Sequence, residues 1–350
     1  MSLLLVALSL VLLPGCLSDL ATTTVFTHGE RADCVCIRGP QLVLAGSTLV
    51  AFADCVPAAG DNCQPLRPHK PPPGAVRRQI YKRSTDGGST FGSLTNAPAL
   101  GVSPVALQDG TLLLIEKTSN KVWRSADGAA TWKVTERTNN STANSGGLIQ
   151  LSAGHKTHPG RLLGVHKVGS GVGQIMAQSC WSDDSGESWQ ESSMKQAHMD
   201  ESEVVELADG AIALLSRNWL NCSAIPLDAP CREHQDGPCM CTAVATSSDG
   251  GETWDGPSVP VPSLAGANCH SAAVSINGST YFSAPIYTGP ARLPNPPHKP
   301  CGYDPVSKRT GHCYTDRAPN RINGTVPTPG NLSMFKSPSL CPCRFVWVHL

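Results

Sequence analysis

Short apolar runs separated by tight turns recur along most of the chain, and they occur in pairs. Two of these turns contain Asp-Gly, at Asp109-Gly110 and Asp209-Gly210, and a third contains Asn277-Gly278. Apolar runs on both sides of such a turn are typical of β-hairpins, because these residues adopt the backbone angles that a two-residue turn needs. The predicted strand pairs are 42–45 with 48–53, 104–107 with 111–115, 148–151 with 161–165, 203–207 with 211–216, and 272–276 with 279–284.

A second pattern follows each of the first four hairpins. The motif Ser-x-Asp-x-(Gly/Ala)-x-(Thr/Ser)-(Trp/Phe) begins at Ser84, Ser125, Ser182 and Ser247. An Asp side chain that binds nearby backbone N–H groups, next to Gly, predicts another hairpin turn, which the aromatic residue anchors in the strands below. Because equivalent acids occupy the same place in every copy, we interpret them as stabilising the fold and not as catalytic or calcium-binding groups.

Each repeating unit therefore consists of two strands, a variable loop and two further strands. Four antiparallel strands, repeated along a chain, describe the blades of a β-propeller, so the predicted fold class is all-β. The fifth unit lacks its Asp motif, because Pro338-Ser339-Leu340-Cys341-Pro342-Cys343 stands in its place. The tail 341–350 does not resemble the strands of a blade, and we expect the chain to be altered or truncated after about residue 337.

The composition agrees with many short elements. Of 350 residues, 33 are Gly, 29 are Pro and only 15% are charged, which is unlike a protein of long amphipathic helices. The 27 basic and 27 acidic residues balance, so no nucleic-acid partner is expected.

Several features predict export. The apolar run from Leu3 to Leu13 is typical of a signal peptide, assigned to residues 1–20, although Leu13-Pro14-Gly15-Cys16 is also similar to a bacterial lipoprotein cleavage site. No other apolar run is long enough to form a transmembrane helix. The 15 cysteines indicate disulfides, and Cys55 with Cys63 is one plausible pair. We therefore expect a secreted or lysosome-like location for residues 21–350. N-glycosylation is predicted at Asn139, Asn140, Asn221, Asn277, Asn323 and Asn331.

The repeated turn resembles the Asp box of the sialidase superfamily, whose catalytic domain is a six-bladed β-propeller. The resemblance implies an exo-alpha-sialidase, a glycoside hydrolase that removes terminal sialic acids from glycoproteins, glycolipids or oligosaccharides without a metal or cofactor. By comparison with that family, we expect the C-terminal closing blade to be missing from this chain.

The segment Arg38-Gly39-Pro40 followed by Ala51-Phe52-Ala53-Asp54 is similar to the family's first site segment. The resemblance makes Arg38 the first of three arginines that clamp the sialic acid carboxylate, and Asp54 a substrate-binding replacement for the usual Glu. Asp61 stands at the spacing of the catalytic acid/base. Val56 occupies the position of a further family arginine.

The segment from Asp200 to Arg217 is similar to the family segment that carries a Glu and the second arginine. Glu201 takes the role of the base that accepts the proton of a tyrosine nucleophile, with Glu203 as the alternative on the same strand face. Arg217 is the second carboxylate clamp. A neutral phenol suits this substrate, because its own carboxylate would repel a carboxylate nucleophile.

The C-terminal part of the family pattern is incomplete. Arg321 or Arg292 is the candidate for the third arginine, and none of the five tyrosines fits the nucleophile. Two functions therefore remain open: an exo-alpha-sialidase, and a non-catalytic propeller that binds sialic acid or other glycans. A receptor domain of the sorting type is disfavoured by the context of Arg38 and Arg217.

Overall fold

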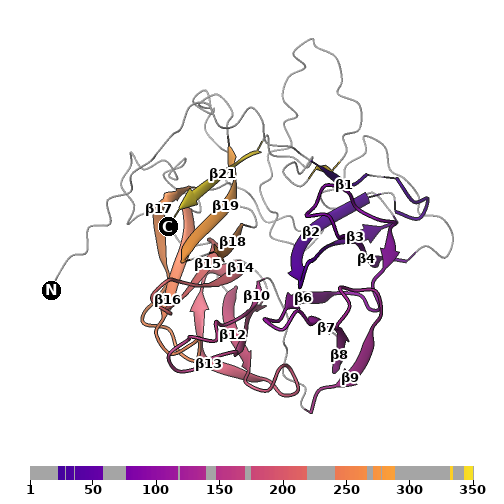
Figure 1. The fold of residues 1–350 in the computed structure, drawn as a ribbon. Helices are drawn as coiled ribbons and strands as arrows, with labels where there is room; N and C mark the ends of the chain where they lie inside the picture. Colours follow the sequence, from indigo (N-terminus) through magenta and orange to yellow (C-terminus); the bar gives the residue numbers. More distant parts are fainter. Residues whose placement is uncertain are drawn as a thin grey trace, which may run out of the picture.

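A computed structural model of the chain shows an all-β protein (Figure 1). None of the described residues belongs to a helix long and apolar enough to cross a membrane. The structure describes residues 23–27, 29–34, 36–57, 76–116, 119–138, 147–169, 175–218, 241–265, 271–276, 278–287, 332–333 and 343–349.

Four antiparallel sheets, each made of four strands that are consecutive in the sequence, follow one another along the chain. The first contains β2 (Cys36–Ala45), β3 (Thr48–Val56), β4 (Arg78–Ser84) and β5 (Thr95–Asn96). The second contains β6 (Val102–Ala106), β7 (Leu112–Glu116), β8 (Lys121–Ser125) and β9 (Lys133–Glu136). The third contains β10 (Leu148–Gln150), β11 (Leu162–Val168), β12 (Met176–Ser182) and β13 (Gln190–Ala197). The fourth contains β14 (Met199–Glu206), β15 (Ile212–Asn218), β16 (Cys241–Ser247) and β17 (Val259–Ala265).

The fifth sheet corrects one expectation from the sequence. It consists of β18 (Ala272–Ile276), β19 (Ser279–Tyr287) and β21 (Cys343–His349), in which β21 pairs antiparallel with β19 over seven residues. The tail expected to be unlike a blade therefore supplies a strand, because its backbone completes a ladder that local sequence does not reveal. A separate pair joins β1 (Thr24–Phe26) to β20 (Leu332–Ser333).

The sheets are arranged around a common centre like propeller blades, and we call each one a blade (Figure 1). The first strands of neighbouring blades contact each other in the order β2, β6, β10, β14 and β18. Apolar side chains fill the space between blades. The largest cluster joins the third blade, through Leu163, Val165 and Trp181, to the fourth, through Met199 and Leu214. Burial on both faces of a blade explains why second strands such as β7 and β15 begin with four apolar residues in a row.

The four repeated turns connect the third and fourth strands of their blades, as predicted. In the first, the Thr90 hydroxyl donates to Asp86 Oδ2 at 2.6 Å, and the Thr90 and Gly88 amides donate to Asp86 Oδ1 and Ser84 Oγ, both at 2.9 Å. The hydrogen bond from the Thr90 hydroxyl is the main reason why the pKa of Asp86 is lowered to about 2. The same contacts surround Asp127, Asp184 and Asp249. Each carboxylate is thus hydrogen-bonded within its own turn, as expected for a residue that stabilises the fold.

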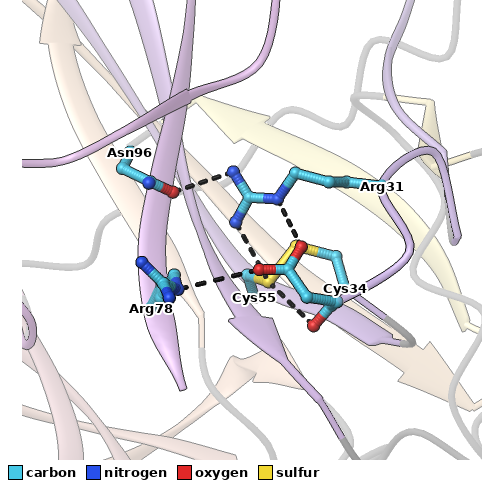
Figure 2. The surroundings of a disulfide bond; sticks show 6 residues. Arg31, Cys34, Cys55, Arg78 and Asn96 are labelled. Carbon is cyan, nitrogen blue, oxygen red and sulfur yellow. Dashed lines mark hydrogen bonds and ion pairs between the residues drawn. A yellow bond between two sulfur atoms is a disulfide. The ribbon is translucent and has the colours of Figure 1, made fainter. Parts of the chain in front are cut away.

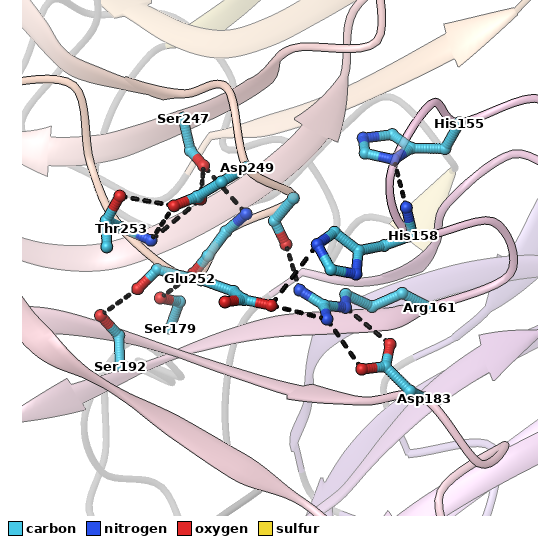
Figure 3. A network of polar contacts seen from close by, with 12 residues as sticks. His155, His158, Arg161, Ser179, Asp183, Ser192, Ser247, Asp249, Glu252 and Thr253 are labelled. Carbon is cyan, nitrogen blue, oxygen red and sulfur yellow. Dashed lines mark hydrogen bonds and ion pairs between the residues drawn. The ribbon is translucent and has the colours of Figure 1, made fainter.

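The fourth repeated turn docks onto the third blade through Arg161 (Figure 3). Only 2% of the Arg161 side chain is exposed, and it donates two hydrogen bonds of 2.7 Å to Asp183 and one of 2.9 Å to Glu252. The guanidinium also lies 5.2 Å from the centre of the Trp181 ring. Because Glu252 belongs to the fourth turn, this network fixes one blade against the next.

A disulfide corrects a second expectation. Cys55 is bonded to Cys34, and not to Cys63 as the spacing suggested (Figure 2). Arg31 lies beside it and donates to Asp33 at 2.5 Å and to Asn96 at 2.8 Å. Cys36 is disulfide-bonded as well. The segment before β2 is therefore tied to the end of β3, near the candidate site.

Candidate functional site

The blades define two different ends of the propeller. The turns between first and second strands lie together at one end: an added Cβ on Gly110 would stand 3.4 Å from Gly46 Cα, and one on Gly278 would stand 3.9 Å from Ala208. The strands of a blade alternate in direction, so the repeated turns lie at this end too. First strands therefore begin, and second strands finish, at the opposite end. Arg38, Asp54, Glu201 and Arg217 all belong to that opposite end.

In the first blade, Arg38 on β2 is directly opposite Asp54 on β3. Asp54 also forms an ion pair with Arg77, which precedes β4. Gly39 has a φ of +59°, and the ladder is irregular between Arg38 and Gln41. Gly39 therefore permits a left-handed backbone next to Arg38.

In the fourth blade, Glu201 on β14 forms an ion pair with Arg217 on β15, with Glu201 Oε2 3.3 Å from Arg217 Nη1. A bulge creates this arrangement. Met199 is opposite Asn218 and Ser202 is opposite Ser216, so Asp200 and Glu201 together face Arg217. A bulge of this kind redirects side chains and is common beside active sites.

The buried hydroxyls of Ser202 and Ser216 form hydrogen bonds within the bulge. The Ser202 hydroxyl lies 2.8 Å from the Ser216 hydroxyl and 3.0 Å from the carbonyl oxygen of Asp200. The Ser216 hydroxyl lies 3.3 Å from the carbonyl oxygen of Glu201. Backbone carbonyls freed by the bulge thus find partners inside the blade.

The structure separates the two glutamates that the sequence offered as alternatives. Glu201 is 44% exposed and faces Arg217. The carboxylate of Glu203 instead lies against Gly147 at the start of the third blade, where an added Cβ would stand only 2.0 Å from Glu203 Oε2. Glu201 is therefore the glutamate available to an incoming molecule, while Glu203 packs between two blades.

The remaining predicted site residues, Asp61, Arg321 and its alternative Arg292, lie outside the described residues. Two tyrosine side chains are described. The Tyr81 hydroxyl donates to the carbonyl of Ala129 at 2.9 Å, within the core beside a repeated turn. Tyr281 lies within β19, opposite Val274.

Three charged residues near the site were not predicted. Arg77 binds Asp54, and Lys167 on β11 binds Asp200 on β14 with 2.6 Å between Lys167 Nζ and Asp200 Oδ1. The only sequence signal for Arg77 is its place before a β-run. For Lys167 and Asp200 the pairing partner is on another blade, so no local pattern points to it.

Within the described part of the chain, one group of three potential metal ligands lies close together: Asp33, Cys34 and Cys55. The two cysteines are bonded to each other, which removes their thiolates as ligands. Guanidinium and carboxylate groups, those of Arg38, Asp54, Glu201 and Arg217, are gathered at the end of the propeller that carries the candidate site. Arg38 and Arg217 suit a planar carboxylate, and Glu201 suits proton transfer.

No protein-family profile matches the chain. Among curated proteins, the sialidase of Micromonospora viridifaciens is 32% identical over 180 residues, which covers 40% of this chain and 28% of that protein. The match thus spans less than a third of the relative's length.

Solved structures share the fold. The Hadza microbial sialidase Hz136 has a TM-score of 0.54 at 17% identity, covering 76% of this chain and 56% of that one. A mutant of the NanB sialidase from Streptococcus pneumoniae has a TM-score of 0.51 at 13% identity, covering 75% and 58%. The leech intramolecular trans-sialidase has a TM-score of 0.50 at 15% identity, covering 78% and 59%. In part of its sequence the chain is therefore similar to a sialidase, and it shares its fold with solved sialidase structures.

Proposed function

We propose that the protein is a retaining exo-alpha-sialidase that acts on terminal sialic acids of glycoproteins, glycolipids or oligosaccharides. The observation that carries this proposal is the Glu201–Arg217 pair on the bulged start of β14. It lies at the same end of the propeller as Arg38 and Asp54. The partial sequence similarity to a sialidase and the fold shared with a solved sialidase support the proposal.

In the proposed mechanism, Arg38, Arg217 and Arg321 hold the substrate carboxylate by charge-assisted hydrogen bonds. Glu201 accepts the proton of a phenol that attacks the anomeric carbon, and Asp61 donates a proton to the departing glycosidic oxygen. Asp61 then removes a proton from a water molecule whose oxygen attacks the anomeric carbon. The bond to the phenol oxygen breaks, Glu201 returns its proton to that oxygen, and the sugar leaves with its original anomeric configuration. The tyrosine is not assigned. Arg77, beside Asp54, supplies a cation that stands in for the arginine missing at Val56.

We further propose that the ring contains six blades. The pairing of β1 with β20 supports this view, because it joins an N-terminal and a C-terminal strand beyond the five larger sheets. We also propose a secretory location with residues 1–20 as signal peptide and N-linked glycans. The Cys34–Cys55 disulfide supports an oxidising compartment.

The proposal is tested with the full chain, expressed through a secretory pathway, and a fluorogenic aryl sialoside. Release of the fluorophore, with the α-anomer of sialic acid as the first product by proton NMR, supports a retaining sialidase. Loss of activity in Glu201→Gln ties the reaction to this site. Binding of a sialoside without hydrolysis favours the second function, a glycan-binding propeller. Absence of both overturns the proposed site.

A further inference from the structure

At the bulge that begins β14, Met199 and Asp200 are buried between the third and fourth blades, whereas the next residue, Glu201, is exposed. Met199 is fully buried and packs in the cluster between the third and fourth blades. Asp200 follows it into the same interface and is only 6% exposed, whereas Glu201 is 44% exposed and meets Arg217. The direction of Glu201 is thus set by how Met199 and Asp200 are held.

Asp200 is held from the neighbouring blade. Lys167 lies near the end of β11, and its ammonium is 2.6 Å from Asp200 Oδ1. A buried carboxylate is costly without a cation, so the pairing favours the bulged arrangement over one in which Asp200 turns to water. Lys167 is itself 45% exposed, which lets its ammonium remain partly hydrated while it binds the buried acid.

We propose that Lys167 and Asp200 are positioning residues for the Glu201–Arg217 pair. Lys167, on the third blade, holds the side chain of Asp200 on the fourth blade. The Ser202 hydroxyl donates a hydrogen bond to the backbone carbonyl of Asp200, so both parts of this bulge residue are fixed. With Lys167 in place, Glu201 has one direction available, toward Arg217. The role of the Glu201–Arg217 pair toward a substrate rests on the proposed function. The effect of Lys167 and Asp200 on the direction of Glu201 does not depend on that function.

The test uses Lys167→Met, Lys167→Arg and Asp200→Asn in the full chain. Lys133→Met serves as the matched control, because Lys133 is an exposed lysine on β9 of a different blade. The first readout is steady-state kinetics on the aryl sialoside. We expect Lys167→Met and Asp200→Asn to lower kcat by about tenfold or more, because a small displacement of a reacting group has effects of this size. Lys167→Arg restores most of the rate, and Lys133→Met leaves it unchanged.

The second readout needs no activity. Phenylglyoxal modifies arginines according to their accessibility, and peptide mass spectrometry follows the rate at Arg217. We expect this rate to rise several-fold in Lys167→Met and to return toward the original value in Lys167→Arg. If the unmodified protein neither hydrolyses nor binds sialosides, the proposed function fails while this readout still decides the positioning role.

The inference is overturned if Lys167→Met and Asp200→Asn lower the melting temperature but leave both kcat and the Arg217 modification rate unchanged. That result would make the pair a contact between blades and nothing more. Should Lys167→Met fail to fold, Asp200→Asn keeps the shape of the side chain and carries the same two readouts.

Discussion

Glu201 and Arg217 meet across the first hairpin of the fourth blade, with 3.3 Å between Glu201 Oε2 and Arg217 Nη1. They are sixteen positions apart in the chain. The pair places a proton acceptor beside a carboxylate-binding group, at the end of the propeller where Arg38 and Asp54 also lie. We expect Glu201→Gln to lower kcat by about 100-fold or more, with a smaller change in KM, because Gln cannot accept a proton.

The same experiment has an internal comparison. Glu203→Gln alters a neighbouring glutamate that packs against Gly147 and lies on β14 opposite Leu215. A larger loss of kcat in Glu203→Gln than in Glu201→Gln would contradict the assignment of the base.

Arg38 is predicted to bind the carboxylate of the substrate. We expect Arg38→Lys to weaken sialoside binding by about tenfold to 100-fold, because Lys cannot form two parallel hydrogen bonds with a carboxylate. Isothermal titration with a non-hydrolysable sialoside measures this effect. Arg83→Lys is the control: Arg83 donates to the carbonyls of Gly128 and Asp127 at the end with the repeated turns. Equal weakening in both variants would count against a carboxylate site at Arg38.

Gly251, in the fourth repeated turn, is predicted to be a position where any side chain destabilises the fold. It has a φ of +89°, and an added Cβ would lie 2.5 Å from Leu163 of the neighbouring blade. We expect Gly251→Ala to lower the free energy of unfolding by about 2–4 kcal/mol, from backbone strain and overpacking together. Gly87→Ala is the matched control, since Gly87 has a φ of +70° with open space around it. It should cost only about 1 kcal/mol. Urea unfolding measures both, and equal costs would show that the contact with Leu163 is unimportant.

The Cys34–Cys55 disulfide is predicted to stabilise the first blade. The two cysteines are 21 residues apart, so removing the cross-link should lower the free energy of unfolding by about 3 kcal/mol. The double variant Cys34→Ser/Cys55→Ser avoids a free thiol, and its denaturant midpoint measures the change. Peptide mapping without reduction checks the pairing itself. A Cys55–Cys63 peptide would contradict the structure.

The repeated turns predict sensitivity to acid. Hydrogen bonds led by the Thr90 hydroxyl lower the pKa of Asp86 from 3.8 to about 2, and the pKa of Asp127 is lowered for the same reason through Thr131. A lowered folded-state pKa means that stability is fully present above about pH 4 and is lost as the pH falls toward about 2. Thermal melts across this range should show the loss. In Asp86→Asn/Asp127→Asn the loss should be smaller, and an unchanged acid profile would argue against these two turns as its source.

Much of the fold could be read from the sequence because it depends on local chemistry. The Asp-Gly turns specify hairpins whose partners are adjacent in the chain, and the five predicted strand pairs all occur. The repeated Ser and Asp positions likewise bind groups within four residues. For the same reason the sequence offered Arg38 with Asp54, and Glu201 with Arg217, as candidate site residues. Each of these two pairs belongs to a single hairpin.

Other features depend on partners that are distant along the chain. The partner of Cys55 is Cys34, β21 pairs with β19 across a long segment, and Lys167 reaches Asp200 on another blade. The choice between Glu201 and Glu203 also required the structure, because alternation along a strand places both on one face until a bulge redirects the chain. The alternation of apolar and polar residues along the sequence indicates which side of a strand is buried. Only the packing of one blade against the next decides which buried groups meet.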